Sequence, residues 1–302
     1  MAPKPFTQTS QAGKVKIFSL ITKRQPFYSM EFFPPKETAQ WPAFFSEVDR
    51  LKALAPAFVS VTYGAGGSSQ GNTLAITKEL AEKGLTPMAH LTCVGASSES
   101  LRSFLGQLAA AGVYNVLALR GDAPQGVQMR WNECEFPYAA DLARFIRNEF
   151  PEFGVSVAAY LTPHPESESF AEDRKMTAAK MEYSDFAVSQ LFFDPREYFE
   201  YVAQMRAMGV TKPILPGVLP IQSLDSIRRV LSLSGCNIPA KLYLSIEEAH
   251  HTGGAKAVKE AGIAYAVEQI RRLIDGGAPG IHLYTLNKAD MCLRIADAVG
   301  PL

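Results

Sequence analysis

The stretch YSMEFFPPKE, residues 28–37, reads as a strand that is buried on both faces and stops at two prolines. Successive side chains of a strand alternate, so Tyr28, Met30 and Phe32 share one face, whereas Ser29 and Glu31 share the other. One face is bulky and apolar, and the opposite face is small and then ionisable. This pattern is typical of a strand inside an α/β sheet whose carboxyl end carries a functional group.

Seven further apolar runs follow along the chain and alternate with segments of helical period. The eight expected strands are Tyr28–Phe33, Ala57–Tyr63, Thr86–Cys93, Asn115–Leu119, Val155–Leu161, Phe186–Phe193, Pro213–Leu219 and Gly280–Leu286. The expected helices are Lys14–Lys23, Trp41–Leu54, Asn72–Glu82, Ser98–Ala111, Tyr138–Phe150, Glu172–Glu182, Pro195–Met208, Ser223–Leu233, Ala255–Asp275 and Ala289–Ala298. Eight strands that are each followed by a helix predict an α/β fold of the (β/α)8 TIM barrel type, with an extra N-terminal helix. A doubly wound open sheet also alternates strands and helices, but the count of eight favours the closed barrel.

The composition is that of a globular chain without an excess of charge. Of its 302 residues 47% are hydrophobic, and 30 basic residues balance 30 acidic ones. Zero net charge argues against nucleic acid or an anionic membrane as the main partner, because such binding needs clustered Lys and Arg. We expect one domain over residues 1–302 that acts on small-molecule substrates, with residues 1–13 as a flexible tail. A homo-oligomer is compatible with the sequence.

The cysteines and the N-terminal segment indicate the cytoplasm. The four cysteines are scattered, with no CxxC pair, which suits a reducing compartment. The segment MAPKPFTQTSQAGK lacks the apolar centre and the cleavage site of a secretory signal. No apolar run is long enough to span a bilayer, so we expect no membrane contact.

The strand pattern predicts that polar side chains converge at one end of the barrel. On each strand one face is bulky and would pack under the helices, whereas the other is small and becomes polar toward the carboxyl end. Seven strands carry a polar residue at such a late position, namely Glu31, Thr62, His90, Arg120, Tyr160, Gln190 and Tyr284. Active sites of (β/α)8 barrels lie at the carboxyl ends of the strands, so these side chains mark the candidate site.

Glu31 is the main candidate for a catalytic group. In so apolar a strand, a buried carboxyl without a partner should have a pKa above its usual value of about 4.3. A carboxyl with a raised pKa can donate a proton near neutral pH, so we predict that Glu31 is a general acid. A carboxylate that is paired with a cation, or exposed at an edge, is the alternative.

Three other sequences carry glycine, charge or histidine in expected loops. In LALRGDAPQG, residues 117–126, Gly121 would let the backbone approach a ligand between Arg120 and Asp122; a tight turn with an internal ion pair is the alternative. The sequence GAGGSSQG, residues 64–71, lacks the spacing of a dinucleotide fingerprint, so we expect a flexible loop. His250 and His251 have no partner ligands at metal spacing, so we predict an exposed loop there and no metal site.

Eight short motifs, one for each expected strand, resemble the methylenetetrahydrofolate reductase family in its bacterial form. In chain order they are YSMEFFPPK, FVSVTYGAGG, HLTC, LALRGD, VAAY followed by HPE, SQLFFD, ILPGVLPI and HLYTLNKA. The resemblance runs from about Lys14 to the C-terminus. It implies a (β/α)8 barrel that binds FAD at the carboxyl end of its strands. It also implies reduction of 5,10-methylenetetrahydrofolate to 5-methyltetrahydrofolate with NADH or NADPH, in a ping-pong order, within one-carbon metabolism and methionine biosynthesis.

Position by position, the resemblance also implies roles for individual residues. Glu31 would protonate the folate and help to open its imidazolidine ring. Asp122 would lie beside the flavin and the pterin, where its charge tunes the flavin and stabilises a cationic form of the substrate. Gln190 would hydrogen-bond the pterin, and Tyr284 and Lys288 would contact the substrate. The positions that would hold FAD are Thr62, His90, Leu119, Arg120, Gly121, Asp122, Tyr138, Ala139, Tyr160, His164, Asp173 and Lys180.

The sequence departs from the family pattern at two places that bear on ligand binding. Lys288 stands where the family more often has Arg, which weakens a bidentate grip on a substrate carboxylate. The segment from Ala240 to Gly254 diverges, so no ligand contact is assigned there.

A barrel that transfers hydride directly from nicotinamide to folate is one alternative function, but the polar cluster on strands three to five argues against it. A non-catalytic accessory subunit is another, but it would have no reason to keep Glu31 and Asp122.

Overall fold

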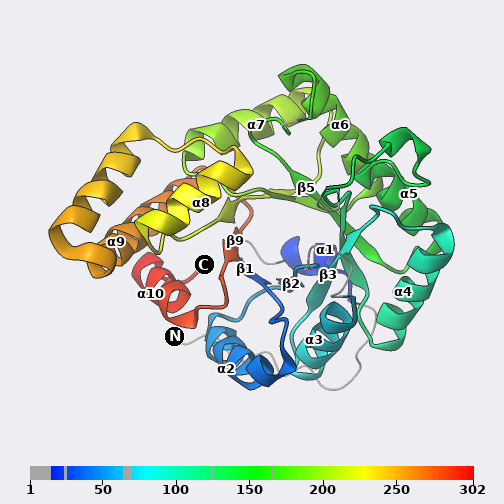
Figure 1. Cartoon of the computed structure of the whole chain (residues 1–302), viewed down its shortest axis with the longest axis horizontal. Helices are drawn as coiled ribbons and strands as arrows, with labels where there is room; N and C mark the ends of the chain where they lie inside the picture. The colour runs from blue at the N-terminus through cyan, green and yellow to red at the C-terminus, as the bar shows by residue number, and fades with distance from the viewer. Residues whose placement is uncertain (1–14, 24–25, 64–69, 124–125, 165) are drawn as a thin grey trace.

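The computed structural model describes residues 15–23, 26–63, 70–123, 126–164 and 166–302, and it shows a ring of parallel strands surrounded by helices (Figure 1). The strands are β1 (Tyr28–Phe32), β2 (Val59–Val61), β3 (Pro87–Thr92), β4 (Asn115–Leu119), β5 (Gly154–Ala159), β6 (Phe186–Ser189), β7 (Ile214–Leu215), β8 (Gly217–Val218) and β9 (Ile281–Tyr284). The expected flexible segments, residues 1–13 and most of the 64–71 loop, lie outside the described residues.

The ring closes through a strand that is interrupted in its middle. β7 pairs with β6, β8 pairs with β9, and only Pro216 separates β7 from β8. Proline has no backbone N–H and interrupts a ladder, although the Pro216 carbonyl still accepts a hydrogen bond from the N–H of His282 at 3.0 Å. Because β9 also pairs with β1, β7 and β8 together form the seventh strand of an eight-stranded barrel. The predicted (β/α)8 fold is confirmed.

All helices except the first lie around the outside of the ring (Figure 1). They are α1 (Ile17–Ile21), α2 (Trp41–Leu51), α3 (Gln70–Glu82), α4 (Ser98–Ala110), α5 (Ala139–Glu149), α6 (Phe170–Tyr183), α7 (Pro195–Ala207), α8 (Leu224–Ser234), α9 (Ala240–Asp275) and α10 (Ala289–Val299). Short 3-10 turns are η1 (Thr38–Gln40), η2 (Lys52–Leu54) and η3 (Trp131–Glu133). The hydroxyls of Ser97, Ser169 and Ser223 accept from backbone N–H groups of the first turn, which fixes where α4, α6 and α8 begin.

The two faces of the strands differ as the alternation predicts. On β1, Met30 and Phe32 belong to the large core between sheet and helices, where the ring of Phe32 meets Phe44 of α2 edge to face at 5.7 Å. Ser29 and Glu31 face the barrel interior and contact side chains of other strands. The outward face therefore holds the barrel together by apolar packing, and the inward face remains available for polar groups.

The N-terminal helix covers the end of the barrel opposite to the strand carboxyl ends. Ile17 and Ile21 are fully buried in a cluster with Phe27 and other residues of the strand amino ends, and in Figure 1 α1 lies behind the ring. Asn115, at the start of β4, accepts from the N–H of Ile17 at 2.9 Å and donates to the carbonyl of Val15 at 2.9 Å. The extra helix is confirmed, although it is shorter than Lys14–Lys23. Ligands must therefore enter from the carboxyl end.

The segment before Gly254 is helical, which corrects the expectation of a loop at His250 and His251. Both histidines lie exposed within α9, which starts at Ala240 rather than at Ala255. Leu242 and Ile246, one helical turn apart, are buried and anchor this first half. At Gly254 (φ 61°, ψ −152°) the backbone leaves helical geometry and separates the two halves. None of the helices in the described ranges has the length and apolar character needed to cross a membrane.

Candidate active site

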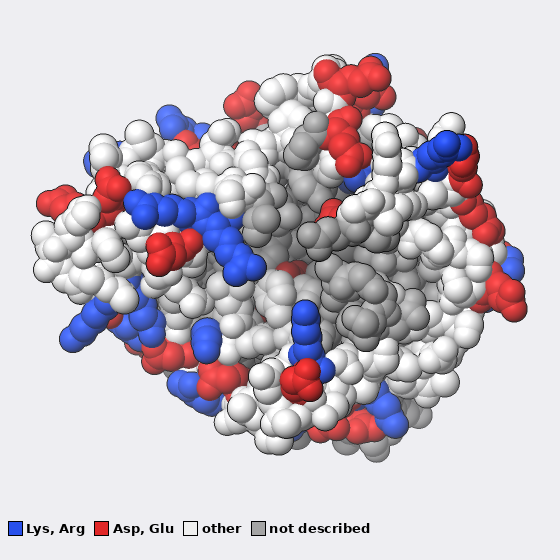
Figure 2. Space-filling model, viewed as in Figure 1, with Lys and Arg blue, Asp and Glu red and all other residues white. Residues whose placement is uncertain are grey.

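A large open cavity lies at the carboxyl ends of β3, β4 and β5. Its volume is about 1540 Å³, and the surface is hollowed near the centre of the face shown in Figure 2. Ten of the twelve positions expected to hold FAD line it, namely Leu119, Arg120, Gly121, Asp122, Tyr138, Ala139, Tyr160, His164, Asp173 and Lys180. Thr62 and His90 are not among the residues that line it. The structure thus brings most of the predicted cofactor positions together around one cavity.

Gly121 follows β4 at the edge of the cavity, and its backbone conformation is one that only glycine adopts without strain. Its φ is +85°, and a Cβ atom there would lie 2.7 Å from Cγ1 of Val94 and 3.0 Å from Cβ of Thr92. Both the left-handed backbone and the close neighbours exclude a side chain. The main chain is therefore bare where it borders the cavity, which agrees with the close approach expected at this position.

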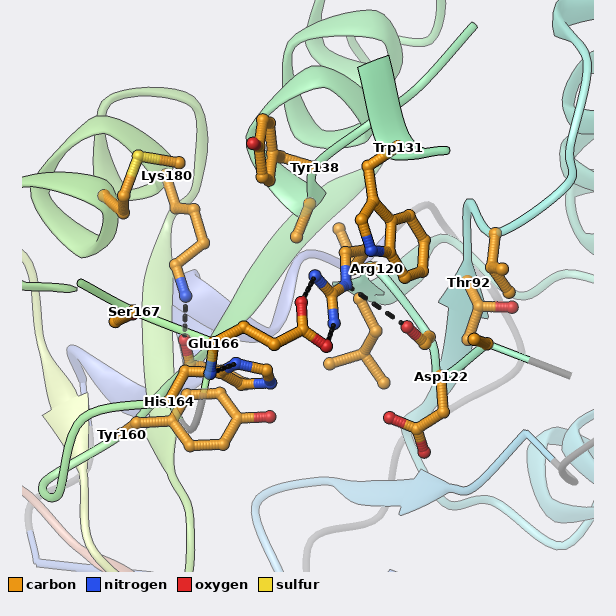
Figure 3. Close-up of a pocket in the computed structure, with 18 of the residues that line it drawn as sticks. Thr92, Arg120, Asp122, Trp131, Tyr138, Tyr160, His164, Glu166, Ser167 and Lys180 are labelled. Atoms are coloured by element: carbon orange, nitrogen blue, oxygen red, sulfur yellow. Dashed lines mark hydrogen bonds and ion pairs between the residues drawn. The ribbon is translucent and has the colours of Figure 1, made fainter. Parts of the chain in front are cut away.

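Arg120 and Asp122 do not pair with each other, so the internal ion pair considered for this turn is absent among the described contacts. The guanidinium of Arg120 donates to both carboxylate oxygens of Glu166, at 2.6 and 3.1 Å, and lies 4.0 Å from the ring centre of Trp131. Asp122 is exposed, and its carboxylate points away from Arg120 (Figure 3). The positive and the negative charge of this turn therefore serve different parts of the site.

A partly buried lysine lies on the opposite side of the cavity. Lys180 of α6 donates to the carbonyl of Ala158 at 2.8 Å. Burial lowers the pKa of Lys180 from 10.5 to about 8, and the negative charge of Asp173 only partly offsets this effect. A partly buried ammonium with a single carbonyl partner retains donors for an anionic ligand. Lys180 and Arg120 are thus two cationic groups on facing parts of one cavity (Figure 3).

Asp173 organises the loop between β5 and α6. Its carboxylate accepts from the N–H of His164 at 3.0 Å and from the hydroxyl of Ser167 at 3.1 Å. The buried Arg174 pairs with Asp173 at 3.1 Å and also donates to the Leu161 carbonyl at 2.7 Å. The described contacts of Asp173 therefore position the loop that carries His164.

A second group of polar side chains lies inside the barrel, on β1, β2, β3 and β9. Oε2 of Glu31 is 3.3 Å from Nε2 of His90 and 3.7 Å from Nε2 of His282. The hydroxyl of Ser60 donates to Glu31 at 3.4 Å, and Nδ1 of His282 is 2.9 Å from Oγ of Ser29. All five residues are buried. We call these five residues the axial cluster.

The end of β1 is held in place by the turn that follows β9. The hydroxyl of Thr285 donates to the carbonyl of Glu31 at 2.6 Å. Asn287, which has a left-handed backbone (φ 56°), accepts from the N–H of Phe33 at 3.0 Å and donates to its carbonyl at 2.6 Å. This backbone bracket fixes the position of Glu31 relative to His282.

The pKa of Glu31 is lowered, which corrects the expectation that it is raised. Burial raises it, but the interactions with the nearby His90 and His282 outweigh burial and bring it from 4.5 to about 2. The expectation considered only the apolar strand around Glu31, and it left out two histidines on neighbouring strands. The paired carboxylate, the alternative in the sequence analysis, describes the structure better.

Gln190, directly after β6, and Tyr284, at the end of β9, lie together at the barrel mouth. The hydroxyl of Tyr284 donates to the carbonyl of Ser189 at 2.8 Å and lies 3.5 Å from Oε1 of Gln190. That same Oε1 accepts from the N–H of Leu191 at 3.1 Å, which leaves the amide NH2 of Gln190 as the donor. A Cβ atom on Gly217 would lie 2.7 Å from the ring of Tyr284, so the glycine makes room for the phenol.

Burial raises the pKa of Tyr284 well above its usual value, and the negative charge of Glu31 adds to this effect. Tyr284 therefore remains a neutral hydrogen-bonding group next to the axial cluster. Lys288, the last predicted substrate residue, is exposed just before α10. Among the described contacts, none joins its side chain to Gln190 or Tyr284.

Sequence reasoning missed three residues of the site. His282 lies two positions before Tyr284, so strand alternation placed it on the same inward face. Glu166 belongs to the HPE motif, but its partner Arg120 is 46 residues away in the chain. Trp131 sits in η3, in a connection without regular periodicity. Strand alternation was a signal for the first and the HPE motif for the second, whereas Trp131 had none.

Comparison with known proteins identifies the family. The family model for methylenetetrahydrofolate reductase matches residues 16–300. The methylenetetrahydrofolate reductase (NADH) 1 of Arabidopsis thaliana is 34% identical over 299 residues, which cover 94% of this chain and 50% of the plant protein. The 5,10-methylenetetrahydrofolate reductase of Salmonella typhimurium is 32% identical over 274 residues, which cover 90% of each chain. This chain thus spans half the length of the plant relative and nine-tenths of the bacterial one.

A solved structure shares the fold. A protein from Clostridium thermocellum that binds two copies of 5-methyl-5,6,7,8-tetrahydrofolic acid superimposes with a TM-score of 0.64, over 93% of this chain and 96% of that one. The two sequences are 12% identical, so this likeness supports the barrel fold alone. The family model covers nearly the whole chain, and the bacterial reductase is matched over nine-tenths of both sequences. The chain therefore belongs to the methylenetetrahydrofolate reductase family.

Proposed function

We propose that this protein reduces 5,10-methylenetetrahydrofolate to 5-methyltetrahydrofolate, with electrons that NADH or NADPH delivers through FAD. The proposal is supported above all by two sites that lie close to each other at the barrel mouth. One is a cavity lined by ten predicted cofactor positions. The other is the axial cluster, whose carboxylate lies between two histidines. The first suits a large anionic cofactor, and the second suits proton transfer to a substrate.

The size and the lining of the cavity support the flavin dinucleotide that the family resemblance implies. Its volume of about 1540 Å³ exceeds the roughly 300–1,000 Å³ of common ligand pockets. Arg120 and Lys180 would bind its phosphates, and Gly121 would let a planar ring approach the backbone. When bound there, FAD would supply the hydride-transfer chemistry between nicotinamide and folate. Nicotinamide and folate would use the same face of the site in turn, which is a ping-pong order.

The axial cluster would supply the proton that opens the imidazolidine ring. An ionised Glu31 cannot donate a proton by itself, so it must first take up a proton. Burial is the largest single influence on the Glu31 pKa, and it favours the neutral acid. Glu31 would then donate to the folate nitrogen as a general acid.

The remaining residues of the mouth would hold the substrate. The free amide NH2 of Gln190 would donate to an acceptor of the pterin, while Tyr284 keeps the amide oriented through its hydroxyl. The exposed carboxylate of Asp122 would stabilise the cationic form of the substrate, because opposite charges attract strongly away from bulk water. Lys288 would meet the acidic end of the folate.

Cofactor binding separates this proposal from its alternatives. The purified protein should absorb in the flavin region, or gain that absorbance when FAD is added. With FAD it should oxidise NADH or NADPH in the presence of methylenetetrahydrofolate. Turnover of folate without any bound flavin would favour direct hydride transfer. Flavin binding with no turnover of either nicotinamide would favour a non-catalytic accessory role.

A further inference from the structure

Arg120 is held from two sides by residues that are distant in the sequence. Its guanidinium lies 4.0 Å from the ring centre of Trp131, a distance typical of a cation–π contact. Both of its terminal nitrogens donate to the carboxylate of Glu166, and Nε lies 3.4 Å from the Gly121 carbonyl. Figure 3 shows the carboxylate and the indole on different sides of the guanidinium. All three nitrogens of Arg120 are therefore engaged.

This arrangement uses the part of Arg120 that an anionic ligand would need. A guanidinium binds a carboxylate or a phosphate through the same planar pair of N–H donors. Glu166 occupies that pair at 2.6 and 3.1 Å, and both residues line the same cavity. A phosphate that binds Arg120 in this bidentate manner must displace the carboxylate of Glu166. The two anions compete for one cation.

The carboxylate can leave without a rearrangement of its loop. The side chain of Glu166 is 55% exposed, whereas that of Arg120 is only 17% exposed. On either side of Glu166 the chain is tied to Asp173, through the N–H of His164 and the hydroxyl of Ser167. A rotation of the Glu166 side chain into solvent is therefore sufficient, and Trp131 still supports the guanidinium after this rotation.

We propose that Glu166 is a charge latch on the cofactor cavity, which competes with the phosphate groups of a dinucleotide for Arg120. The latch rests on the proposed function in so far as the dinucleotide is FAD. Release of Glu166 would accompany cofactor binding, and its return to Arg120 would promote cofactor release. Glu166 thus weakens binding, although it lies among residues that favour it.

Neighbouring glutamates provide a matched pair of variants. Glu166→Gln removes the charge that pairs with Arg120. Glu168→Gln removes another exposed charge, which lines the same cavity and makes no ion pair among the described residues. An exposed ion pair of this kind changes an equilibrium about 1.5- to 5-fold. Glu166→Gln should lower the dissociation constant of FAD by about that factor, and Glu168→Gln should change it less. The difference should shrink at 1 M salt, which screens exposed charges.

Inorganic pyrophosphate tests the latch without flavin. The chain has two tryptophans, so a Trp41→Phe background leaves Trp131 as the fluorescent reporter beside Arg120. Pyrophosphate should change the Trp131 emission. In the double variant that also carries Glu166→Gln, the half-maximal change should occur at a pyrophosphate concentration about 1.5- to 5-fold lower. Far-UV circular dichroism checks that each variant is folded.

The outcomes separate the latch from the proposed function. Equal affinities of wild type and both variants for FAD and pyrophosphate would overturn the latch. Weaker binding to Glu166→Gln would also overturn it, because Glu166 would then orient Arg120 for the ligand. Pyrophosphate binding in the expected order, together with no FAD binding, would refute the flavin and keep the latch. A chain that binds neither probe would refute both.

Discussion

The axial cluster around Glu31 and the cavity wall around Arg120 lie at the same end of the barrel, but they are built differently. In the cluster, every side chain sits on a strand and is buried, and strand register fixes its neighbours. On the wall, Glu166 and Trp131 come from connections between elements, and they hold Arg120 by contacts that solvent reaches. One region is rigid by construction, and the other can exchange partners.

The difference suggests a division of labour between strands and loops. Proton transfer requires groups that are held at a constant distance, and rigid elements hold them more accurately than loops. Binding and release of a large cofactor require charges that can change partners. We therefore expect substitutions in the axial cluster to affect chemistry, and substitutions on the cavity wall to affect cofactor affinity. The following predictions test this division, from the largest expected effect to the smallest.

Glu31→Gln should lower the steady-state rate of folate reduction by about a hundred- to ten-thousand-fold. Gln keeps the shape and the hydrogen bonds of the side chain but cannot act as an acid, and general acid catalysis contributes about this factor. The measurement is kcat with methylenetetrahydrofolate as the acceptor. The Glu168→Gln variant serves as a control for loss of a carboxylate near the mouth, and it should stay within a few-fold of wild type.

Glu31 should also make stability depend on pH. Its pKa in the folded protein, about 2, is lower than its ordinary value of 4.5, so the ionised form stabilises the fold above pH 4.5. This contribution, of about 3 kcal/mol, disappears as the pH falls from 4.5 to 2. The free energy of unfolding of wild type minus that of Glu31→Gln should therefore decrease over this range. Urea titrations at pH 7, 4.5 and 3 measure it, and a pH-independent difference would contradict the charged cluster.

Gly121→Ala should destabilise the cavity wall and weaken FAD binding. The substitution combines a left-handed backbone with a Cβ atom 2.7 Å from Val94, so it should cost about 2–3 kcal/mol of unfolding free energy. Gly126→Ala is the matched control, because Gly126 has a φ of +79° but no atom within 4 Å of its Cβ position. It should cost about 1 kcal/mol and leave FAD affinity unchanged. Thermal unfolding and FAD titration of both variants separate the effect of the steric clash at residue 121 from that of backbone strain.

Asp122→Asn should have the smallest of these effects, and it should change the rates of the two half-reactions unequally. A partly screened carboxylate near a developing charge interacts by about 1–2 kcal/mol, which is about tenfold in rate. Loss of the charge should raise the reduction potential of the flavin and slow folate reduction more than flavin reduction by nicotinamide. Potentiometry and stopped-flow absorbance report the two effects. Unchanged potential and rates would remove Asp122 from the site.

The strand-borne part of the molecule was largely predictable from the sequence. Alternation on β1 placed Met30 outward and Glu31 inward, and the count of strands and helices predicted the barrel. The same reasoning considered each strand separately, so it predicted a raised pKa for Glu31. The two histidines that lower the pKa lie on β3 and β9. Their distance from Glu31 depends on strand register across the barrel, which one strand's pattern does not contain.

The loop-borne part was predictable only where a family motif covered it. LALRGD placed Arg120 at the mouth, but its partners come from η3 and from the loop after β5. Side-chain pairs between loops follow no sequence period, so neither Trp131 nor Glu166 could be assigned. The helix before Gly254 was missed for a related reason, because its pattern of buried residues is short and ends at a glycine.

The most direct test of the central claim is the reoxidation of pre-reduced Glu31→Gln protein by methylenetetrahydrofolate. NADH or NADPH first reduces the flavin anaerobically, and stopped-flow absorbance then follows its reoxidation after mixing with the folate. We predict that flavin reduction stays within a few-fold of wild type, that FAD remains bound, and that reoxidation slows by about a hundredfold or more. Reoxidation of the variant at the wild-type rate would contradict the account and would make the buried carboxylate a structural group.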